Sequence, residues 1–446
     1  MKKLVAIVLS AVMAVGVCGA LAGCGGGNTL TIWSFTDEID DIVEKFKEDV
    51  NPDYEIEVVK ASTASHHSKL REALRNGTAP DVFTVEYAYA RNFLESGKLM
   101  SLSEDGFDFE TRAREEMYEY TVDFMTDAGG TLRALSWQAT PGAFFYRRST
   151  AKEYLGTDDP EEVQKYFETF DDFVETTKLL DERSNGEVKI LSSLDDIRRI
   201  YLSNRTTGWL SDDNMLTIEQ QVLDYMSMAK FLQGGTVTEK YINGTTEQQE
   251  SWFNDMANPD VFGYFLPTWG LHYYLKQHSN NGSGYDATGD WAVIKGPQTF
   301  VDGGTWLAAN SDSDMKEAAK EFIEYVIFNQ DFLRWWANTT GDFLSNKRIV
   351  DEIKDSYSEP FLNGQNHYAF FAEIVDDISV DYVSAYDSAL DGMFKEQVVF
   401  YARGEKTAAE ALQTFVDNTR SSYAEWNYPD AATIASLAAQ VKEITG

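Results

Sequence analysis

The sequence predicts an α/β protein in which a mostly parallel sheet is flanked by helices. Between Thr29 and Val85, the spacing of apolar residues changes from two to about 3.6 and back, twice, which predicts a doubly wound β-α-β-α-β unit. The chain has 446 residues, 43% of them hydrophobic, so it is long enough to bury the cores of two domains. It contains two cysteines, and Cys18 lies in the apolar N-terminal run, so the core must stabilise the fold without disulfides.

The first part of the chain alternates short strands with amphipathic helices. In order, the expected elements are a strand at 29–33, a helix at 37–50, a strand at 54–59, a helix at 65–76 and a strand at 82–85. Gly77 ends the second helix, because glycine is favoured just after a helix. Ligands of such sheets bind in the loops that follow the carboxyl ends of the strands, here 33–38 and 86–87.

The rest of the chain is expected to be mainly helical, with two further β segments. The expected elements are a β-like segment at 133–146, one long helix at 160–182, a mostly helical region at 184–260 with a loop near 208–214, a strand at 261–266, an exposed loop at 279–290, a helix over 315–326 capped by Ser313 or Asp314, and helices at 406–425 and 430–443.

The N-terminus has the pattern of a secretory signal that ends in a lipid attachment site. Two lysines and an apolar run precede residues 21–24, which read Leu-Ala-Gly-Cys, the pattern at which bacterial lipoproteins are cleaved and acylated. This predicts a signal peptide at 1–23, a lipidated Cys24 and a Gly-rich spacer over 24–28. The alternative is a transmembrane helix, since the apolar run has about the necessary length. The lipoprotein interpretation places the chain on the extracellular face of the cytoplasmic membrane, on a Gram-positive cell surface.

The charge of the chain limits its partners. A net charge of −35 repels nucleic acid and anionic lipid, so neither is expected to bind. No second apolar stretch is long enough to cross a bilayer, so we expect membrane contact only through the lipid anchor, and a monomer. The five histidines are too few and wrongly spaced for a metal site, and no P-loop, dinucleotide fingerprint or nucleophile elbow is present. We therefore expect no cofactor, no metal and no catalysis.

Several segments, in their order and spacing, resemble the extracellular solute-binding proteins of carbohydrate ABC transporters, the family that includes maltose-binding protein. The matching segments are Thr31–Trp33, Gly77–Phe83 (a G-x-x-P-D-V-F run), Ala134–Arg147, Phe265–Trp269, Trp291–Ala308 and Gly404–Ala411. The resemblance implies a two-lobed, periplasmic-binding-protein-like fold. Each lobe is expected to be a mostly parallel sheet flanked by helices, with a ligand cleft between the lobes, which close around a sugar. It places an N-terminal lobe at 28–139 plus 303–335 and a C-terminal lobe at 140–302 plus 336–446.

A neutral sugar needs flat apolar faces for its C–H groups and planar polar side chains for its hydroxyls. The resemblance implies an oligosaccharide cargo that is delivered to ABC-transporter permease subunits, and it aligns Trp269 with an aromatic residue that stacks on the sugar. The candidate ligand-binding residues are Trp33, Asp37, Glu38, Glu86, Tyr87, Trp137, Gln138, Trp209, Asp212, Trp269, Gly304, Trp306, Asp342, Asn363 and Gln365. Alternatively, Trp269 lies in the core, and Asp37 and Glu38 complement a helix dipole.

Three other functions stay open. A surface glycoside hydrolase or lyase would need two carboxylates roughly 5–5.5 or 6.5–9.5 Å apart across a sugar, and Glu86 with Asp212 would be the pair. An adhesion lipoprotein would need no ligand cleft. A member of the same family could instead carry a peptide, a glycerol phosphate or a metal ion. A phosphate cargo would require clustered Arg or Lys in the cleft loops, and these loops are acidic and aromatic.

Overall fold

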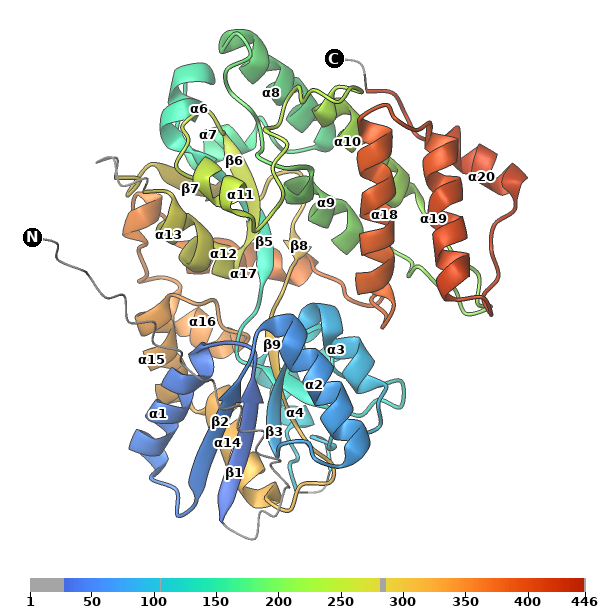
Figure 1. Ribbon diagram of the computed structural model, residues 1–446. Coiled ribbons are helices and arrows are strands. Elements are labelled where there is room, and N and C mark those ends of the chain that lie inside the picture. The colour runs from blue at the N-terminus through green and yellow to red at the C-terminus, as the bar shows by residue number, and fades with distance from the viewer. Residues whose placement is uncertain (1–27, 105, 281–285, 445–446) are drawn as a thin grey trace, which may run out of the picture.

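The chain folds around two β-sheets, each with helices packed against it, which lie one above the other in Figure 1. The computed structural model describes residues 28–104, 106–280 and 286–444. The predicted signal peptide and the lipidation site Cys24 lie outside these described residues. Within the described ranges, no helix combines the length and the apolar character that a membrane span requires.

The first sheet has five strands in the order β2-β1-β3-β9-β4 and is the lower sheet of Figure 1. Its strands are β1 (Thr29–Ser34), β2 (Glu55–Lys60), β3 (Val82–Glu86), β4 (Ala134–Ser136) and β9 (Thr305–Ala309). β1 lies parallel to β2 and β3, as the alternating pattern predicts, whereas β9 runs antiparallel to β3 and β4. The chain reaches β9 only after it has formed the second sheet, so the first sheet is completed by a strand that returns from the second half.

The second sheet is centred on β5 (Pro141–Arg147), which is buried along its whole length. β6 (Gly263–Pro267), β7 (Trp291–Ile294) and β8 (Phe300–Val301) all pair with β5 in the antiparallel direction. The expectation of a mostly parallel sheet is therefore wrong for this half. The chain therefore runs along β5 in the direction opposite to all three of its partners.

Helices cover both sheets, and their apolar faces supply the cores. In α1, for example, Ile39, Ile42 and Phe46 are fully buried at helical spacing, and the helix ends at Asn51 in the left-handed conformation. The helices on the first sheet are α1 (Glu38–Val50), α2 (Thr63–Asn76), α3 (Tyr87–Leu94), α4 (Glu110–Glu116), α5 (Glu119–Asp123), α14 (Lys316–Phe328), α15 (Gln330–Thr340) and α16 (Lys347–Ile353).

The remaining helices lie on the second sheet or between the two sheets (Figure 1). Those of the second half are α6 (Arg148–Tyr154), α7 (Pro160–Gln164), α8 (Phe170–Arg183), α9 (Leu194–Ser203), α10 (Gln220–Gln233), α11 (Glu250–Asp255), α12 (Thr268–Gly270), the π-helical turn η1 (Leu271–Leu275), α13 (Lys276–His278), α18 (Asp387–Ala402), α19 (Ala408–Ser422) and α20 (Ala431–Ala438). The short helices η2 (Pro360–Leu362), α17 (His367–Ile374) and η3 (Val375–Asp377) connect the halves.

Two helix boundaries differ from the prediction. The long helix expected at 160–182 is two helices, α7 and α8, because Thr169 and Asp172 form a capping box that starts α8 afresh. The residue before α14 is Met315 rather than Ser313 or Asp314, although the Ser313 hydroxyl accepts a hydrogen bond from the Met315 amide at 2.9 Å. Periodicity identified these helices, and local side-chain hydrogen bonds decided where they begin.

Three hydrogen-bonded segments lie where the two sheets meet. Residues 137–140 link β4 to β5, residues 302–304 link β8 to β9, and a third segment near Leu344 forms a bridge with Gln138. The Ala139 amide donates to the Phe343 carbonyl at 2.8 Å, which holds the first and third segments together. These bonded segments define where the two halves meet.

Candidate functional site

A cavity of about 380 Å³ lies where the two halves of the molecule face each other. The first half of the molecule contributes Tyr87 and Ala88, at the start of α3, to the lining of this cavity. The other wall comes from α9, the 301–302 segment and the start of α18, and it carries charged residues of both signs, among them Arg199, Arg205, Asp302, Asp387 and Asp391. The cavity is therefore polar and charged, with the end of β3 on one side and the second half on the other.

Glu86 ends β3 and caps α3, so two elements fix its position. Its carboxylate accepts a hydrogen bond from the Ala88 amide at 2.9 Å. Burial raises the pKa of Glu86 to about 8; the nearby charge of Asp302 adds to the rise and Arg199 opposes it. The carboxyl group predicted from the strand-to-loop pattern therefore faces the second half of the molecule and can donate as well as accept a hydrogen bond at neutral pH.

A buried histidine holds the backbone of Glu86 in place. His67 donates from Nδ1 to the Thr63 carbonyl at 2.7 Å, which leaves Nε2 to accept the Glu86 amide at 3.0 Å. Burial lowers the pKa of His67 to about 4, so the ring is neutral and keeps this pattern at physiological pH. Its ring is stacked on Tyr89, with 4.3 Å between the centroids. The base of the predicted site is thus rigid.

Arg199 joins two carboxylates across the cavity wall. Its Nη1 lies 3.1 Å from Asp302 Oδ2, and its Nη2 forms an ion pair with Glu247. Burial disfavours the charge on Arg199, but the two carboxylates outweigh this and hold its pKa above the ordinary value. The side chain of Arg199 is 10% exposed, so its planar donors are largely dehydrated and fixed in direction.

Trp269 lies beside the 302–304 segment. Its Nε1 donates to the Asp302 carbonyl at 3.0 Å, and the ring meets Tyr274 edge-on with centroids 5.0 Å apart. The ring is half-buried. A Cβ at Gly303 would lie 2.9 Å from Trp269 Nε1, so the glycine lets the backbone pass directly against the indole. Trp269 thereby shares Asp302 with Arg199.

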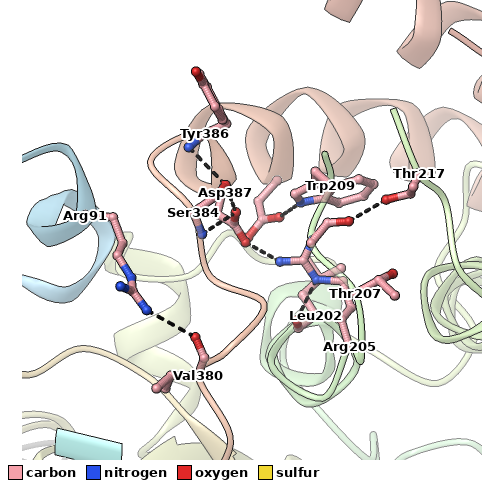
Figure 2. Close-up of polar contacts among 12 residues, drawn as sticks. Arg91, Leu202, Arg205, Thr207, Trp209, Thr217, Val380, Ser384, Tyr386 and Asp387 are labelled. Carbon is pink, nitrogen blue, oxygen red and sulfur yellow. Dashed lines mark hydrogen bonds and ion pairs between the residues drawn. The ribbon is translucent and has the colours of Figure 1, made fainter. Parts of the chain in front are cut away.

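The far end of the cavity is held by a buried ion pair, shown in Figure 2. The Arg205 guanidinium donates to the Asp387 carboxylate, which also accepts from the Ser384 amide and hydroxyl. The same guanidinium lies 5.0 Å from the Tyr382 ring centroid. Arg91 of α3 donates to the Val380 carbonyl at 3.5 Å. The segment before α18 is therefore attached to both halves.

A second group of predicted residues meets at the opposite side of the interface. Glu38, the first residue of α1, accepts a hydrogen bond from the Tyr273 hydroxyl of η1. Burial raises the pKa of Glu38, and the Tyr273 and Thr36 hydrogen bonds oppose the rise. Asp342 is buried, with Oδ2 accepting from Gln138 Nε2 at 3.2 Å, and burial followed by the charge of Glu38 raises its pKa well above the ordinary value. Gln138 and Asp342 thus bond each other at the connecting segments.

Three of the predicted tryptophans lie in the cores. Trp137, Trp209 and Trp306 are each no more than 1% exposed. Trp306 Nε1 donates to the Thr121 carbonyl at 2.9 Å, and Trp209 Nε1 donates to Asp391 at 2.7 Å. Their buried rings present no face to a ligand and fit the alternative of a core tryptophan. Gly304 instead contributes through its backbone, whose carbonyl accepts from the Tyr87 amide at 3.2 Å.

The other predicted residues lie outside the lining of this cavity. Trp33, at the end of β1, is half-buried against the first core. Asp37 is exposed and forms an ion pair with Lys60 at 2.6 Å, and Asp212 is exposed in the turn after Trp209. Asn363 is exposed, and Gln365 bonds the backbone of Val293 through both its oxygen, at 2.9 Å, and its nitrogen, at 2.7 Å. None of the four polar residues Asp37, Asp212, Asn363 and Gln365 lines the described cavity.

Basic residues line the cavity, although the strand-end loops are acidic and aromatic. Arg198, Arg199, Arg205 and Lys395 all line the cavity. Arg198 and Arg199 lie on α9, Arg205 follows that helix and Lys395 lies on α18, so none of them belongs to the strand-end loops. Each of these cations pairs with a carboxylate, however, so the cavity has no excess of free positive charge. Among residues 28–104, 106–280 and 286–444, no cluster of His, Cys, Asp or Glu could hold a metal ion.

Comparisons with known proteins agree with this architecture. The family of bacterial extracellular solute-binding proteins matches residues 41–360. The fold matches a crystal structure of an extracellular solute-binding protein of family 1, with a TM-score of 0.75 at 14% identity over 92% of this chain and 99% of that one.

Two further structures come from sugar-binding proteins. One is the ABC-transporter-associated binding protein from B. animalis subsp. lactis Bl-04 in complex with β-1,6-galactobiose (TM-score 0.68, 18% identity, 91% of this chain and 100% of that one). The other is the galacto-N-biose-/lacto-N-biose I-binding protein of the ABC transporter from Bifidobacterium longum, in complex with lacto-N-biose (TM-score 0.68, 17% identity, 91% and 100%). A comparison with curated proteins found no match. At these identities the structures show the two-lobed fold, and the family match, which covers well over half of the sequence, shows that this chain belongs to the bacterial extracellular solute-binding proteins.

Proposed function

We propose that this chain is a lipid-anchored extracellular protein that binds an oligosaccharide and delivers it to the permease subunits of an ABC importer. The family membership supports capture of a solute outside the cell. The similar structures in complex with β-1,6-galactobiose and lacto-N-biose support a sugar as the solute. The lipobox at residues 21–24 supports the anchor. The two lobes proposed are 28–139 plus 303–335 and 140–302 plus 336–446, except that the end of α15 and α16 pack on the first half and belong with the first lobe.

One observation carries the proposal of a sugar site: a half-buried tryptophan lies beside dehydrated, planar charged groups at the interface of the lobes. Trp269 offers an apolar ring face, and its neighbour Asp302 shares Arg199 with Glu247. Glu86 faces Asp302 from the other lobe. Such a set supplies stacking for the C–H face of a sugar ring and fixed donors and acceptors for its hydroxyls.

Binding is tested with the chain from residue 25 onward, which contains every described element. Tryptophan fluorescence and calorimetric titration are measured against gluco-, malto-, xylo-, manno- and galacto-saccharides. We expect saturable binding of one class, which Trp269→Ala weakens at least tenfold, that is, by about 1.4 kcal/mol or more. Trp335→Ala is the matched control, because Trp335 is also half-buried but lies on α15 with Lys45 over its ring. Equal loss in both variants would contradict the assigned site.

The same complex tests whether the chain is catalytic. The saccharide recovered after long incubation is expected to be unchanged in length and linkage. Glu86 and Asp212 were the candidate acid pair, and Asp212 is exposed in a turn away from the residues that line the cavity. Products of hydrolysis or elimination in chromatography would replace the binding proposal with an enzyme.

The anchor is tested separately in cells. Cys24→Ser removes the thiol that would carry the lipid, so we expect the chain to lose labelling by a radioactive fatty acid. Cys18→Ser is the control, because Cys18 lies within the predicted signal. Undiminished labelling of the Cys24→Ser chain would contradict lipid attachment at this residue.

A further inference from the structure

A second pocket, here called the α10 pocket, lies on the second half of the molecule at the end of α10. Its volume is about 350 Å³, and it is lined by the later part of α10, the two glycines that follow this helix, Lys240 and residues 442–444. In Figure 1, α10 and the C-terminal end of the chain lie at the top of the molecule, away from the first sheet. Of the residues that the structure describes, none lines both this pocket and the cavity between the halves. The α10 pocket is therefore separate from the proposed sugar site.

The lysines that line the α10 pocket differ from the other lysines of this half. Among residues 140–280, 286–302 and 380–444, only the Nζ atoms of Lys230, Lys240 and Lys442 have no hydrogen-bond acceptor or carboxylate beside them. The acceptors of the other lysines are carbonyl, amide or hydroxyl oxygens for Lys189 and Lys406, and carboxylates for Lys152, Lys165, Lys178, Lys276, Lys295 and Lys395. Ammonium groups without an acceptor thus gather in one pocket of a chain whose net charge is −35.

Two of these lysines converge because glycines leave space for them. Gly234 ends α10 in the left-handed conformation and Gly235 follows it. A Cβ at Gly235 would lie 3.5 Å from Lys230 Cε, and a Cβ at Gly234 would lie 3.6 Å from Lys240 Cδ. The two lysine side chains therefore pass over the same short stretch of backbone, one from the helix and one from the loop that follows it.

The third lysine reaches the same place from the C-terminal end of the chain. The Lys442 amide donates to Ser227 Oγ at 3.0 Å, and Ser227 precedes Lys230 by about one turn of α10. Glu443 is the one carboxylate among the residues that line the pocket. Three ammonium groups and one carboxylate leave the lining with two positive charges.

Contacts within the protein account for only part of this arrangement. Lys230 lies in the last turn of α10, where a cation is favourable, but Lys240 and Lys442 lie outside the helix. Lys230 Nζ is 5.2 Å from the centroid of the Tyr401 ring, and Lys240 Nζ is 4.5 Å from that of Tyr241. These rings hold the ammonium groups in place but supply no oxygen acceptor, so N–H donors are left over.

We propose that the α10 pocket binds a phosphate group, either inorganic phosphate or that of a small phosphate ester. A phosphate group carries a charge of about −1.5 to −2 at neutral pH and three acceptor oxygens, which match the two surplus charges and the three ammonium groups. A carboxylate would leave one of these charges uncompensated. The volume lies within the roughly 300–1,000 Å³ of small-molecule pockets. This proposal does not depend on the sugar site.

The first test is equilibrium dialysis of radiolabelled inorganic phosphate against the chain from residue 25 onward, at constant ionic strength. We expect saturable binding at about pH 7.5 that is at least about threefold weaker at about pH 5, because phosphate loses its second charge near pH 6 while lysine stays protonated. Sulfate, which is doubly charged at both pH values, should compete equally at both. Stronger competition by glycerol phosphate than by inorganic phosphate would identify an ester as the ligand, and weaker competition would identify the free ion. Absence of saturable binding, or binding that is equal at both pH values, would overturn the proposal.

The second test assigns the site. Lys240→Gln and Lys442→Gln should each weaken phosphate binding by about threefold or more, and the double variant should abolish it. Lys69→Gln is the matched control, because Lys69 is exposed on α2 and the substitution changes the net charge by the same amount. An equal loss in the control would show a general charge effect and overturn the assignment. Circular dichroism and sugar affinity should be the same in all these variants and the wild type, so failure of this proposal would leave the proposed function intact.

Discussion

The wild-type chain should lose stability as the pH rises, because Glu86 is buried in its protonated form. The substitution Glu86→Gln should abolish this pH dependence. In the folded chain, the Glu86 carboxyl group has a pKa of about 8, compared with an ordinary value of 4.5. Between these two pH values the unfolded chain ionises at this residue while the folded chain keeps the proton. The unfolded state then binds fewer protons, so the free energy of unfolding falls as the pH rises through this window.

The structure sets the size of this effect. A rise in pKa from 4.5 to about 8 corresponds to about 5 kcal/mol, which is an upper limit because Glu86 keeps partial contact with solvent. Glutamine has the same shape, and its amide oxygen can still accept the Ala88 hydrogen bond that caps α3. The variant therefore has no ionisable group at this position but keeps the hydrogen bond that caps α3.

The assay is thermal unfolding followed by circular dichroism at several pH values between 4.5 and about 8. The melting temperature of Glu86→Gln should approach that of the wild type at the acidic end and exceed it increasingly toward the alkaline end. Glu72→Gln is the control, because Glu72 is exposed on α2 and its curve should run parallel to that of the wild type. A constant separation between Glu86→Gln and the wild type at all pH values would refute the reasoning.

Three further outcomes are expected from the same contacts. Asp387→Asn removes the carboxylate that accepts from the buried Arg205 guanidinium but leaves Asp391 nearby, so it should cost about 1.5–3 kcal/mol in urea unfolding, whereas a loss below about 1 kcal/mol would show that the ion pair is not needed. Trp209→Phe removes the hydrogen bond to Asp391 and should cost about 1–3 kcal/mol while leaving sugar affinity unchanged; reduced affinity would return Trp209 to the site. Gly303→Ala places a Cβ 2.9 Å from Trp269 Nε1 at a φ of +69° and should reduce sugar affinity at least tenfold in calorimetry, with unchanged affinity contradicting the contact.

The first sheet could be predicted because its strands and helices have clear periods. β1, α1 and β3 lie close to the expected ranges, and Glu86 was identified because it ends a buried strand. The direction of β5 could not be predicted, since the alternation of residues is the same whether neighbouring strands are parallel or antiparallel. Sequence likewise located α8 but not its start, which depends on the reciprocal bonds between Thr169 and Asp172.

The site was harder to predict because it is built from helix faces as well as loops. Arg199 and Arg205 come from α9 and its end, and which face of that helix meets the other lobe depends on packing between distant segments. Trp209 and Trp306 were predicted to contact the ligand, yet both are buried in the cores, where their indole nitrogens donate to Asp391 and to the Thr121 carbonyl. The residue type alone does not determine the direction of a side chain.

The hydrogen bond between Trp269 and the Asp302 carbonyl has a mechanical consequence. Residue 302 belongs to the segment that carries the chain from β8 back to β9, so the indole is fastened to the joint itself. A sugar that displaces this ring would therefore also displace residue 302, because the hydrogen bond joins the two directly. The tryptophan emission of this protein would then follow the angle between its lobes as well as the occupancy of its cleft, in one optical signal.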